Sequence, residues 1–410
     1  MTEKSTKPQL RFAGFDDTWE QRKVGDLLIE RNQQAPMSDE YPLMAFIANE
    51  GVAPKGERYD RSALVTDTVN KLYKKTEKGD FIYSSNNLET GSIGLNKYGK
   101  ACISPVYSIF EPTGIADSDF LGRRLVRKDF INAMVKWRQG VIYGQWRIHE
   151  SDFLKIEIPV PSVEEQRKIG AYLDQLDNLI TLHQRKYDKL TNVKKSMLEK
   201  MFPKNGSNVP EIRFKGFSDA WEQRKLGEVG KARSGVGFPD TEQGGTIGVP
   251  FFKVSDMNSD GNENEMTVAN NYVTAEQIAA HRWSPIEEVP ALFFAKVGAA
   301  VMLNRKRLCR FPFLLDNNTM AYSLSSTEWD ADFAKALFET IDLTSLVQVG
   351  ALPSYNAGNV EAMEISMPSL SEQGRIGEFF KQLDNLITLH QRELEKLKNL
   401  KKACLEKMFV

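Results

Sequence analysis

Few positions in this sequence combine residue types and spacing that could support chemistry. The closest match to a phosphate-binding loop is the run GLNKYGK, in which Gly94, Gly99 and Lys100 have P-loop spacing. A P-loop requires Ser or Thr directly after the lysine to bind Mg²⁺, and Ala101 occupies that position. A strand followed by a turn is therefore the better interpretation of this segment.

Other catalytic patterns are missing from the sequence. Pro239-Asp240 could open a nuclease motif, but no acidic-x-Lys triplet follows within the next fifty residues. There is no GxGxxG run for a dinucleotide and no Asn-Pro-Pro or Asp-Pro-Pro run of the kind that adenine methyltransferases use. The sequence therefore predicts a chain that is not itself an enzyme and that holds no cofactor.

The histidines and cysteines are the possible metal ligands. His183 and His390 stand at equivalent positions of an internal repeat and could meet as a metal pair. No cysteine or third histidine lies near them in the sequence, so we interpret them as buried polar residues that fix helix register. The three cysteines, Cys102, Cys309 and Cys404, are odd in number and far apart, which argues against disulfides and zinc. We predict no metal site.

Clusters of basic, amide and hydroxyl side chains are the remaining candidates, and these groups can read base edges in DNA. Lys and Arg total 54 against 55 for Asp and Glu, so any DNA contact must be local. Taken one by one, such clusters are more often solvated loops, and they gain weight only from the architecture around them. The predicted DNA-binding residues are Ser84, Ser85, Asn86, Asn87, Lys97, Arg123, Arg124, Gln145, Arg147, Lys253, Ser255, Asn258, Arg305, Lys306, Arg307, Asn317, Asn318 and Tyr355.

Length and composition limit the protein class. The chain has 410 residues, 41% hydrophobic and 27% charged, which fits two or three ordinary globular domains. The longest nearly apolar run, 291–303, contains Lys296 and is too short to span a bilayer. The polar N-terminus lacks the apolar core of a secretory signal. We expect a soluble, cytoplasmic protein that does not enter membranes.

The elements that position these residues belong to an internal sequence repeat, which occurs twice in the chain. Residues 11–27 and 213–229 are identical at 11 of 17 positions, and QLDNLITLHQR recurs unchanged at 175–185 and 382–392. The blocks between these repeats are nearly equal in length but show no evident similarity to each other. The sequence therefore indicates a tandem duplication in which the repeated segments, which we call the frame, stayed similar while the blocks between them diverged.

The repeats and blocks together predict an α+β protein. Within the blocks, short apolar runs such as 81–83, 103–109, 249–254 and 297–303 alternate with Gly, Asn, Asp and Ser, as strands and loops do. Helices are plausible at 129–139 and 329–341. The predicted domains are an N-terminal conserved segment (1–27), a first variable domain (28–157), a central conserved region (158–229), a second variable domain (230–364) and a C-terminal conserved region (365–410).

The long repeats have the apolar pattern of a coiled coil. Spacings of three and four residues alternate over ten positions in each copy, and eight of the ten are apolar. This predicts helices over 163–201 and 370–408 whose seams pack on each other antiparallel. The predicted seam includes Leu173, Leu176, Ile180, His183, Leu190, Phe380, Leu383, Ile387, His390 and Leu397.

The ends of these helices are also marked in the sequence. Ser162 with Glu165, and Ser369 with Glu372, have the spacing of capping boxes at the two starts. Pro203 and the polar loop after it should end the first helix.

With these motifs in place, the chain resembles the specificity subunit of type I restriction-modification systems. The resemblance rests on the repeated RFxGFxDxWEQRKxG segment, a variable block, and IPVPSVEEQRKIGAYLDQLDNLI leading into a long helix. The Pro-Ser-x-x-Glu-Gln-x-x-Ile-Gly signature at 161–170 returns at 368–377, with Gly374 and Arg375 as differences in the second copy. The match covers the whole chain.

The resemblance implies both a fold and a set of partners. The variable blocks would be mixed α/β target recognition domains, joined and spaced by two long antiparallel coiled-coil helices with internal pseudo-two-fold symmetry. Two modification subunits would dock on the repeated regions and carry S-adenosylmethionine and the adenine-N6 methylation chemistry. Restriction subunits would add ATP- and Mg-dependent translocation and cleavage. This chain would bind double-stranded DNA and hold no cofactor itself.

Two other functions remain open at the level of the residues alone. A coiled-coil adaptor whose two domains bind proteins or glycans would show the same repeats. An enzyme with a fused methyltransferase and nuclease is opposed by the missing motifs. Salt-dependent binding of a specific duplex separates the DNA-binding interpretation from the adaptor.

Overall fold

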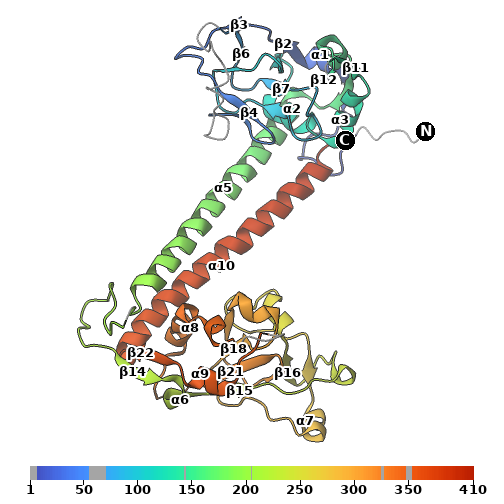
Figure 1. Cartoon of the computed structure of the whole chain (residues 1–410). Coiled ribbons are helices and arrows are strands. Elements are labelled where there is room, and N and C mark those ends of the chain that lie inside the picture. The colour runs from blue at the N-terminus through green and yellow to red at the C-terminus, as the bar shows by residue number, and fades with distance from the viewer. Residues whose placement is uncertain (1–6, 55–70, 143–144, 205, 325–326, 348–352) are drawn as a thin grey trace. The chain divides into compact units, whose positions relative to one another are not determined.

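The computed structural model describes residues 7–54, 71–142, 145–204, 206–324, 327–347 and 353–410. The chain forms two compact units (Figure 1): unit 1 is Met1–Leu182 with Glu395–Val410, and unit 2 is His183–Leu394. Among the described residues, no helix is both long enough and apolar enough to cross a membrane. The predicted limits of the variable domains, 28–157 and 230–364, stay a prediction.

Unit 1 is built on a four-stranded antiparallel sheet. One of its two inner strands, Phe81–Tyr83, has all three side chains buried, which is possible only when both faces of the sheet are covered. In sheet order the strands are β2 (Leu28–Glu30), β10 (Ser108–Pro112), β7 (Phe81–Tyr83) and β8 (Ile93–Leu95). Smaller sheets flank it: β3 (Gln34–Ala35), β6 (Tyr73–Thr76) and β9 (Ala101–Ile103); β4 (Ala45–Ile47) and β5 (Gly51–Ala53); β11 (Gln139–Ile142) and β12 (Gln145–Arg147).

Short helices cover this sheet and close the core of unit 1. Phe110 and Phe153 lie 4.6 Å apart between ring centroids, and Phe81 stacks on Phe153 from the neighbouring strand. Burying rings of this size is the main source of the unit's stability. The helices are α1 (Val24–Leu27), α2 (Ser118–Arg124), α3 (Lys128–Val135) and α4 (Glu150–Phe153).

Unit 2 has its own sheets and core. A four-stranded antiparallel sheet runs β15 (Gly230–Ser234), β21 (Thr319–Leu324), β18 (Ala291–Ala295), β19 (Lys306–Cys309), and a second sheet runs β17 (Tyr272–Val273), β16 (Val249–Phe252), β20 (Leu314–Leu315). The helices are α6 (Leu226–Val229), α7 (Ala275–His281), α8 (Ala331–Thr340) and α9 (Ala357–Glu361), with 3₁₀ turns η3 (Asp240–Glu242), η4 (Val254–Asn258), η5 (Ala299–Leu303) and η6 (Leu343–Leu346).

The two variable blocks share a topology although their sequences do not match. If the four strands of each main sheet are counted in chain order, the first pairs with the fourth, the fourth with the second, and the second with the third. The frame around each block is also the same, because β1 (Glu20–Lys23) pairs with β13 (Glu157–Val160) as β14 (Glu222–Lys225) pairs with β22 (Glu364–Met367). The duplication therefore extends through the blocks and is not confined to the frame.

The predicted long helices are confirmed to within one residue. They are α5 (Val163–Lys200) and α10 (Leu370–Lys407), and both are unbroken. Within unit 2, His183 contacts His390 while Lys194, further along α5, pairs with Asp384, earlier on α10, at 2.6 Å. Because residues later in α5 contact residues earlier in α10, the two helices are antiparallel. In unit 1, Asp177 pairs with Lys401 in the same sense.

The apolar seam is buried against the core of each unit. In unit 1, Leu173 and Leu176 pack in the same cluster as Cys404 and Met408. In unit 2, Leu190 packs against the cluster that holds Phe380 and Leu383. Of the remaining predicted seam residues, those half-buried are Ile180, His183, Ile387, His390 and Leu397.

Three local predictions were wrong. The apolar run 103–109 was expected to form a strand, but it spans the turn between β9, which ends at Ile103, and β10, which begins at Ser108. Residues 297–303 were expected to form a strand, but Gly298, at a φ of +82°, turns the chain into the 3₁₀ turn η5. The neighbouring strand is β18, which ends at Ala295. The helix expected over 129–139 ends at Val135, because the chain then enters the β11–β12 hairpin.

Candidate nucleic-acid interface

The repeated sequence signature joins each long helix to the segment that precedes each block. We call the Arg–Glu pair that makes this connection in each unit the clasp. In unit 1, Arg11 donates from Nε and Nη2 to both carboxylate oxygens of Glu165, at 2.7 and 2.8 Å. In unit 2, Arg213 makes the same bidentate pair with Glu372, at 2.7 Å for each bond. Both glutamates are 1% exposed, so each pair is shielded from solvent on the acidic side.

The next residue of the signature fixes a helix of the block. Gln166 accepts a hydrogen bond from the backbone N–H of Asp117 at 2.9 Å, and Asp117 in turn caps helix α2. In unit 2, Gln373 accepts from the N–H of Asp330, which caps α8. The block helix and the frame helix are therefore joined at the same point in both units.

The signature glycine allows this close approach. A Cβ at Gly170 would lie 2.7 Å from Oδ1 of Asp117, and a Cβ at Gly377 would lie 2.3 Å from Oδ1 of Asp330. Any side chain at either position would push the helices apart.

The clasp changes the capping prediction. The hydroxyls of Ser162 and Ser369 accept from the backbone N–H of Glu165 and Glu372, both at 3.4 Å, as a capping residue does. The glutamate carboxylates, however, are occupied by the arginines of the RF segment rather than returning to the cap. The predicted capping boxes were therefore half correct.

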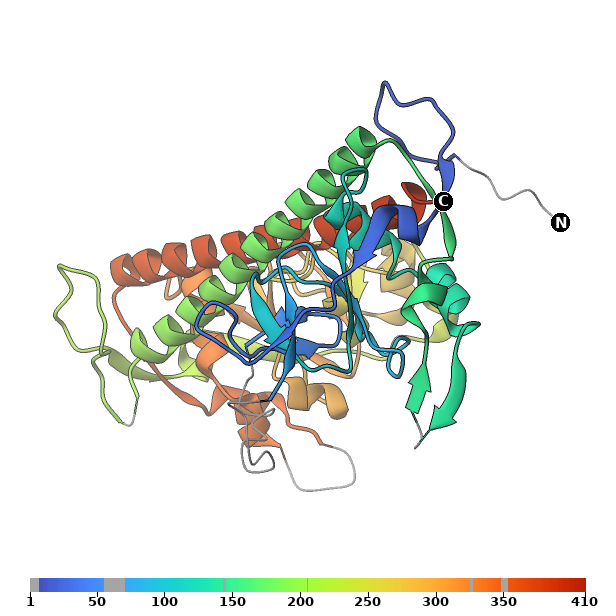
Figure 2. The same cartoon turned by 90° about the horizontal axis from the view of Figure 1, so that it is seen from above.

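In unit 1 the predicted polar loop 84–87 is tied to the β11–β12 hairpin. The hydroxyl of Ser85 accepts from the N–H of Ile148 at 3.0 Å, and Oδ1 of Asn86 accepts from the N–H of Trp146 at 2.6 Å. Arg138 donates to the carbonyl of Ser85 at 3.2 Å. Seen from above, the hairpin projects from the body of unit 1 (Figure 2).

This hairpin presents a cation and two indoles to solvent. Trp146 is 45% exposed and Arg147 67% exposed on the same strand. Trp137, which precedes the hairpin, is 39% exposed, and the guanidinium of Arg138 lies 6.0 Å from the Trp146 ring centre. Exposed aromatic and cationic groups on a projecting hairpin can stack on bases and contact phosphate. With the exposed Asn87, they form what we call the hairpin surface.

In unit 2, one group of predicted residues gathers around the buried carboxylate of Asp316. Asn318 donates to it from its backbone N–H at 3.2 Å and its side-chain amide at 3.3 Å. Burial raises the pKa of Asp316, and the charge of nearby Lys253 opposes that rise. Burial likewise lowers the pKa of Lys296, whose backbone N–H donates to the carbonyl of Asn318. Asn317 and Asn318 themselves are exposed.

A second group lies where η4 meets the start of β19. Asp256 is fully buried and accepts from the N–H groups of Lys253 and Asn270, both at 2.7 Å, which fixes the turn. Oδ1 of the exposed Asn258 accepts from Arg305 at 2.8 Å. With the exposed Ser255 on the same turn, these side chains form a polar surface of neutral and cationic donors.

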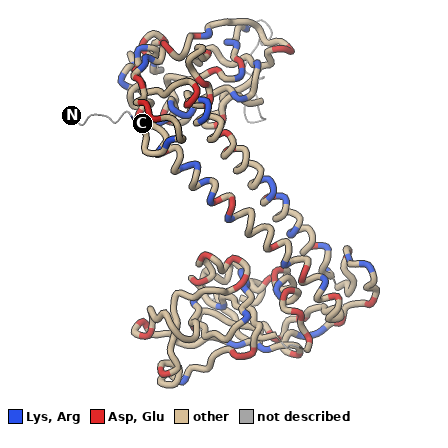
Figure 3. Tube along the Cα trace, turned by 180° about the vertical axis from the view of Figure 1, so that it is seen from behind, with Lys and Arg blue, Asp and Glu red and all other residues tan. Residues whose placement is uncertain are grey.

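Basic and acidic residues are interspersed along the trace of each unit (Figure 3). No group of three or more His, Cys, Asp or Glu side chains among the described residues is arranged to hold a metal ion. Any affinity for a polyanion must therefore come from local surfaces of the kind described above.

Comparison with known proteins identifies the class of chain. A family model described as the type I restriction modification DNA specificity domain matches residues 16–192 and again residues 218–399. The chain belongs to this family. Its function is the recognition of DNA sequence in a type I restriction-modification system, and it carries the specificity domain twice.

Individual relatives are distant. The chain is 23% identical to the type I restriction enzyme MjaVIII specificity subunit of Methanocaldococcus jannaschii, over 94% of this chain and 91% of the relative. It is 22% identical to the MjaIX specificity subunit of the same organism, over 63% of this chain and 61% of the relative. Its fold matches the crystal structure of an S subunit from M. genitalium with a TM-score of 0.61 and 14% identity, covering 98% and 99% of the two chains.

For a DNA specificity domain, side chains must reach solvent to contact a duplex, and burial corrects four of the predicted contacts. Ser84 is 6% exposed, Arg124 4%, Lys306 5% and Tyr355 5%. Lys306 donates to the carbonyl of Ile341 at 2.6 Å, and burial lowers its pKa to about 8. The Tyr355 hydroxyl donates to the carbonyl of Ala295 at 2.6 Å. These side chains support the fold.

Two further arginines are engaged internally. Arg123 pairs with Asp177 of α5 at 2.9 Å and is 12% exposed. Arg307 donates to the carbonyl of Asn262 at 2.8 Å. Both are half-buried, and their contact with DNA stays a prediction.

The other predicted contacts stay predictions. Lys97 is half-exposed but pairs with Asp174 at 3.0 Å. The side chain of Gln145 lies outside the described residues. Sequence reasoning missed Trp146 and Lys296. The sequence signal for Trp146 was its position between Gln145 and Arg147, whereas its exposure is a property of the fold.

The two repeat-equivalent histidines do meet. Nδ1 of His183 lies 3.1 Å from Nδ1 of His390, and the rings are nearly perpendicular. Burial, followed by the charges of His183 and Lys186, lowers the pKa of His390. Both histidines are half-buried rather than buried, and their role in helix register stays a prediction.

Proposed function

We propose that each specificity domain of this chain reads one half of a bipartite, asymmetric DNA target. The observation that carries the proposal is that two blocks with no evident sequence similarity have the same sheet order and the same clasp. A common scaffold with different exposed side chains is what two recognition domains for two different half-sites require. The bases between the half-sites would be read by neither domain.

The candidate readers differ between the units. In unit 1 they are on the hairpin surface, where Asn87, Trp146 and Arg147 are exposed. In unit 2 they are on the two polar groups, where Asn258 and Asn318 are exposed and Arg305 is half-buried. Two weak contacts on one chain reinforce each other because each raises the effective concentration of the other.

We also propose that the chemistry resides in partners. Two modification subunits would bind S-adenosylmethionine and methylate adenine at N6, and restriction subunits would use ATP and Mg²⁺. The chain would bind none of these cofactors and have no turnover of its own. It would act in the cytoplasm, where both the host chromosome and incoming duplexes are accessible.

An exchange of blocks tests the proposal. Residues 28–157 are replaced with the matching block of another specificity subunit, and the chimaera is expressed with its modification subunits in a host without other methylases. Methylome sequencing should show a target changed in one half only. The unaltered chain is the control. A target changed in both halves, or in neither, would overturn the modular reading.

A further inference from the structure

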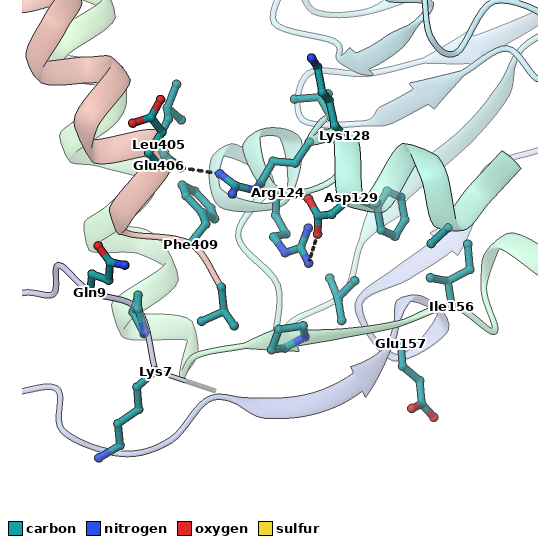
Figure 4. A pocket seen from close by; sticks show the side chains of 18 of the residues that line it. Lys7, Gln9, Arg124, Lys128, Asp129, Ile156, Glu157, Leu405, Glu406 and Phe409 are labelled. Carbon is teal, nitrogen blue, oxygen red and sulfur yellow. Dashed lines mark hydrogen bonds and ion pairs between the residues drawn. The ribbon is translucent and has the colours of Figure 1, made fainter. Parts of the chain in front are cut away.

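Unit 1 contains a groove that the recognition surfaces do not use. It has a volume of about 1150 Å³ and opens between four chain segments (Figure 4). These are Lys7–Gln9, the stretch 124–133 around the start of α3, the stretch 156–159 at β13, and the last turns of α10 with the residues after it, 398–410; Gln21 of β1 also lines the groove. Three of the four belong to the repeated frame or its N-terminal extension.

The floor of the groove is apolar. Phe409 and Phe130 are 5% and 2% exposed, and Leu405 is half-buried beside them. At the edge, Val126 is 38% exposed. A large aliphatic or aromatic side chain entering the groove would therefore be removed from water on several sides, at about 25 cal/mol per Å² of apolar surface buried.

The rim is strongly basic. Seven Lys and Arg residues line the groove against three acidic ones, Asp129, Glu157 and Glu406. Three exposed lysines of this rim, Lys128, Lys398 and Lys402, have no ion-pair partner within the described part of the chain. The groove is therefore a local positive site on a chain whose formal net charge is −1.

Two of these seven basic residues, Arg124 and Arg127, lie near the base of the groove. Arg124 is 4% exposed and pairs with Asp129 at 2.9 Å, while its Nε and Nη1 have no hydrogen-bond partner. Next to it, Arg127 donates to the carbonyl of Leu405 and lies over the Phe409 ring, 5.5 Å from its centre. Two cations near the base of the groove with a single carboxylate beside them favour an occupant that brings negative charge.

Shape decides between a nucleic acid and a protein as that occupant. A duplex presents a convex row of phosphates and has no apolar side chain to fill a recess. A protein segment with one large apolar residue flanked by Asp or Glu fits both the floor and the rim.

We propose that this groove docks an acidic segment of a modification subunit. A large apolar side chain lies over Leu405 and Phe409, and flanking carboxylates meet Lys128, Lys398 and Lys402. The identity of the partner rests on the proposed function, whereas the chemistry of the segment rests on the groove. The C-terminal end of α10 thereby serves as a partner contact in addition to its part in the helix pair.

Charge reversal tests the groove without disturbing the core. Lys398→Glu with Lys402→Glu, and separately Val126→Asp, alter exposed rim positions only. Each purified full-length variant is titrated with the purified modification subunit by calorimetry in the absence of DNA. We expect affinity at one of the two binding sites to fall about 10- to 100-fold, so that the bound ratio drops from two subunits to one.

The matched control is Lys78→Glu, which reverses an exposed lysine of unit 1 outside the groove and should leave affinity unchanged. Unaltered binding by both groove variants would overturn the proposal. Normal binding of the modification subunit with weakened binding of DNA by the assembled complex would also overturn it, because the groove would then contact nucleic acid. Failure of the unaltered chain to bind the modification subunit would instead contradict the proposed function.

Discussion

Removal of Arg213 should destabilise unit 2 by about 3 kcal/mol. The carboxylate of Glu372 is 1% exposed and receives both of its bidentate hydrogen bonds from this one guanidinium. Loss of one partner of a buried pair costs about 3–5 kcal/mol, because the other charge is left desolvated. The lower end applies because Arg213 itself keeps 12% of its exposure. Against a total stability of about 5–15 kcal/mol, this is a large loss.

Hydrogen exchange read by mass spectrometry is the appropriate measurement, since a chain of two units need not unfold in one step. In Arg213→Ala, exchange should accelerate at the start of α10 and of α8, while unit 1 keeps its protection. Arg11→Ala is the matched control and should produce the reciprocal pattern in unit 1. Arg213→Met with Glu372→Met should recover most of the stability. A loss below about 1 kcal/mol, or a double variant as unstable as the single one, would refute this account of the clasp.

Three further predictions follow from the same geometry. Leu176→Asp, at a seam position 4% exposed, should cost several kcal/mol in thermal or denaturant unfolding, and wild-type stability in that variant would contradict a buried seam. Because the pKa of His390 is lowered in the folded chain, the unfolded chain binds more protons below about pH 6.5, so stability should fall on acidification; His183→Leu with His390→Leu should flatten that pH dependence, and an unchanged profile would count against it. Arg305→Gln should reduce the slope of log affinity for DNA against log salt concentration by about one unit, because one phosphate contact is lost. Lys306→Gln should instead lower the stability of the fold and leave that slope unchanged. Equal slopes for the two variants would contradict a DNA contact by Arg305 and a structural role for Lys306.

Burial explains why the recognition residues were predicted less well than the fold. Arg305, Lys306 and Arg307 are adjacent in sequence and read as one basic cluster. Along the strand β19 successive side chains point to opposite faces, so Lys306 is buried and donates to the carbonyl of Ile341, whereas Arg307 is half-buried and donates to the carbonyl of Asn262. Which face is inward depends on what packs against the strand, and that information lies far away in the chain.

The same reason applies on helix α2. Arg123 and Arg124 looked like a phosphate-binding pair, but Arg123 meets Asp177 of α5 and Arg124 meets Asp129 of α3. Their partners are carboxylates brought into reach only by the packing of helices. On the hairpin surface, Asn87 and Arg147 were predicted and Trp146 was missed, since nothing local showed that this tryptophan would remain exposed.

The sequence by itself determined the duplication, the two long helices and their antiparallel seam. The helices and their seam follow from local apolar periodicity, and the duplication follows from motifs that recur in the sequence. The tertiary structure alone decided that the unlike blocks share one sheet order, that the Glu-Gln signature clasps Arg11 and Arg213, and which basic side chains reach solvent. Each of these depends on contacts between segments that are separate in the sequence, such as Arg11 with Glu165 or Lys306 with Ile341, for which no local pattern exists.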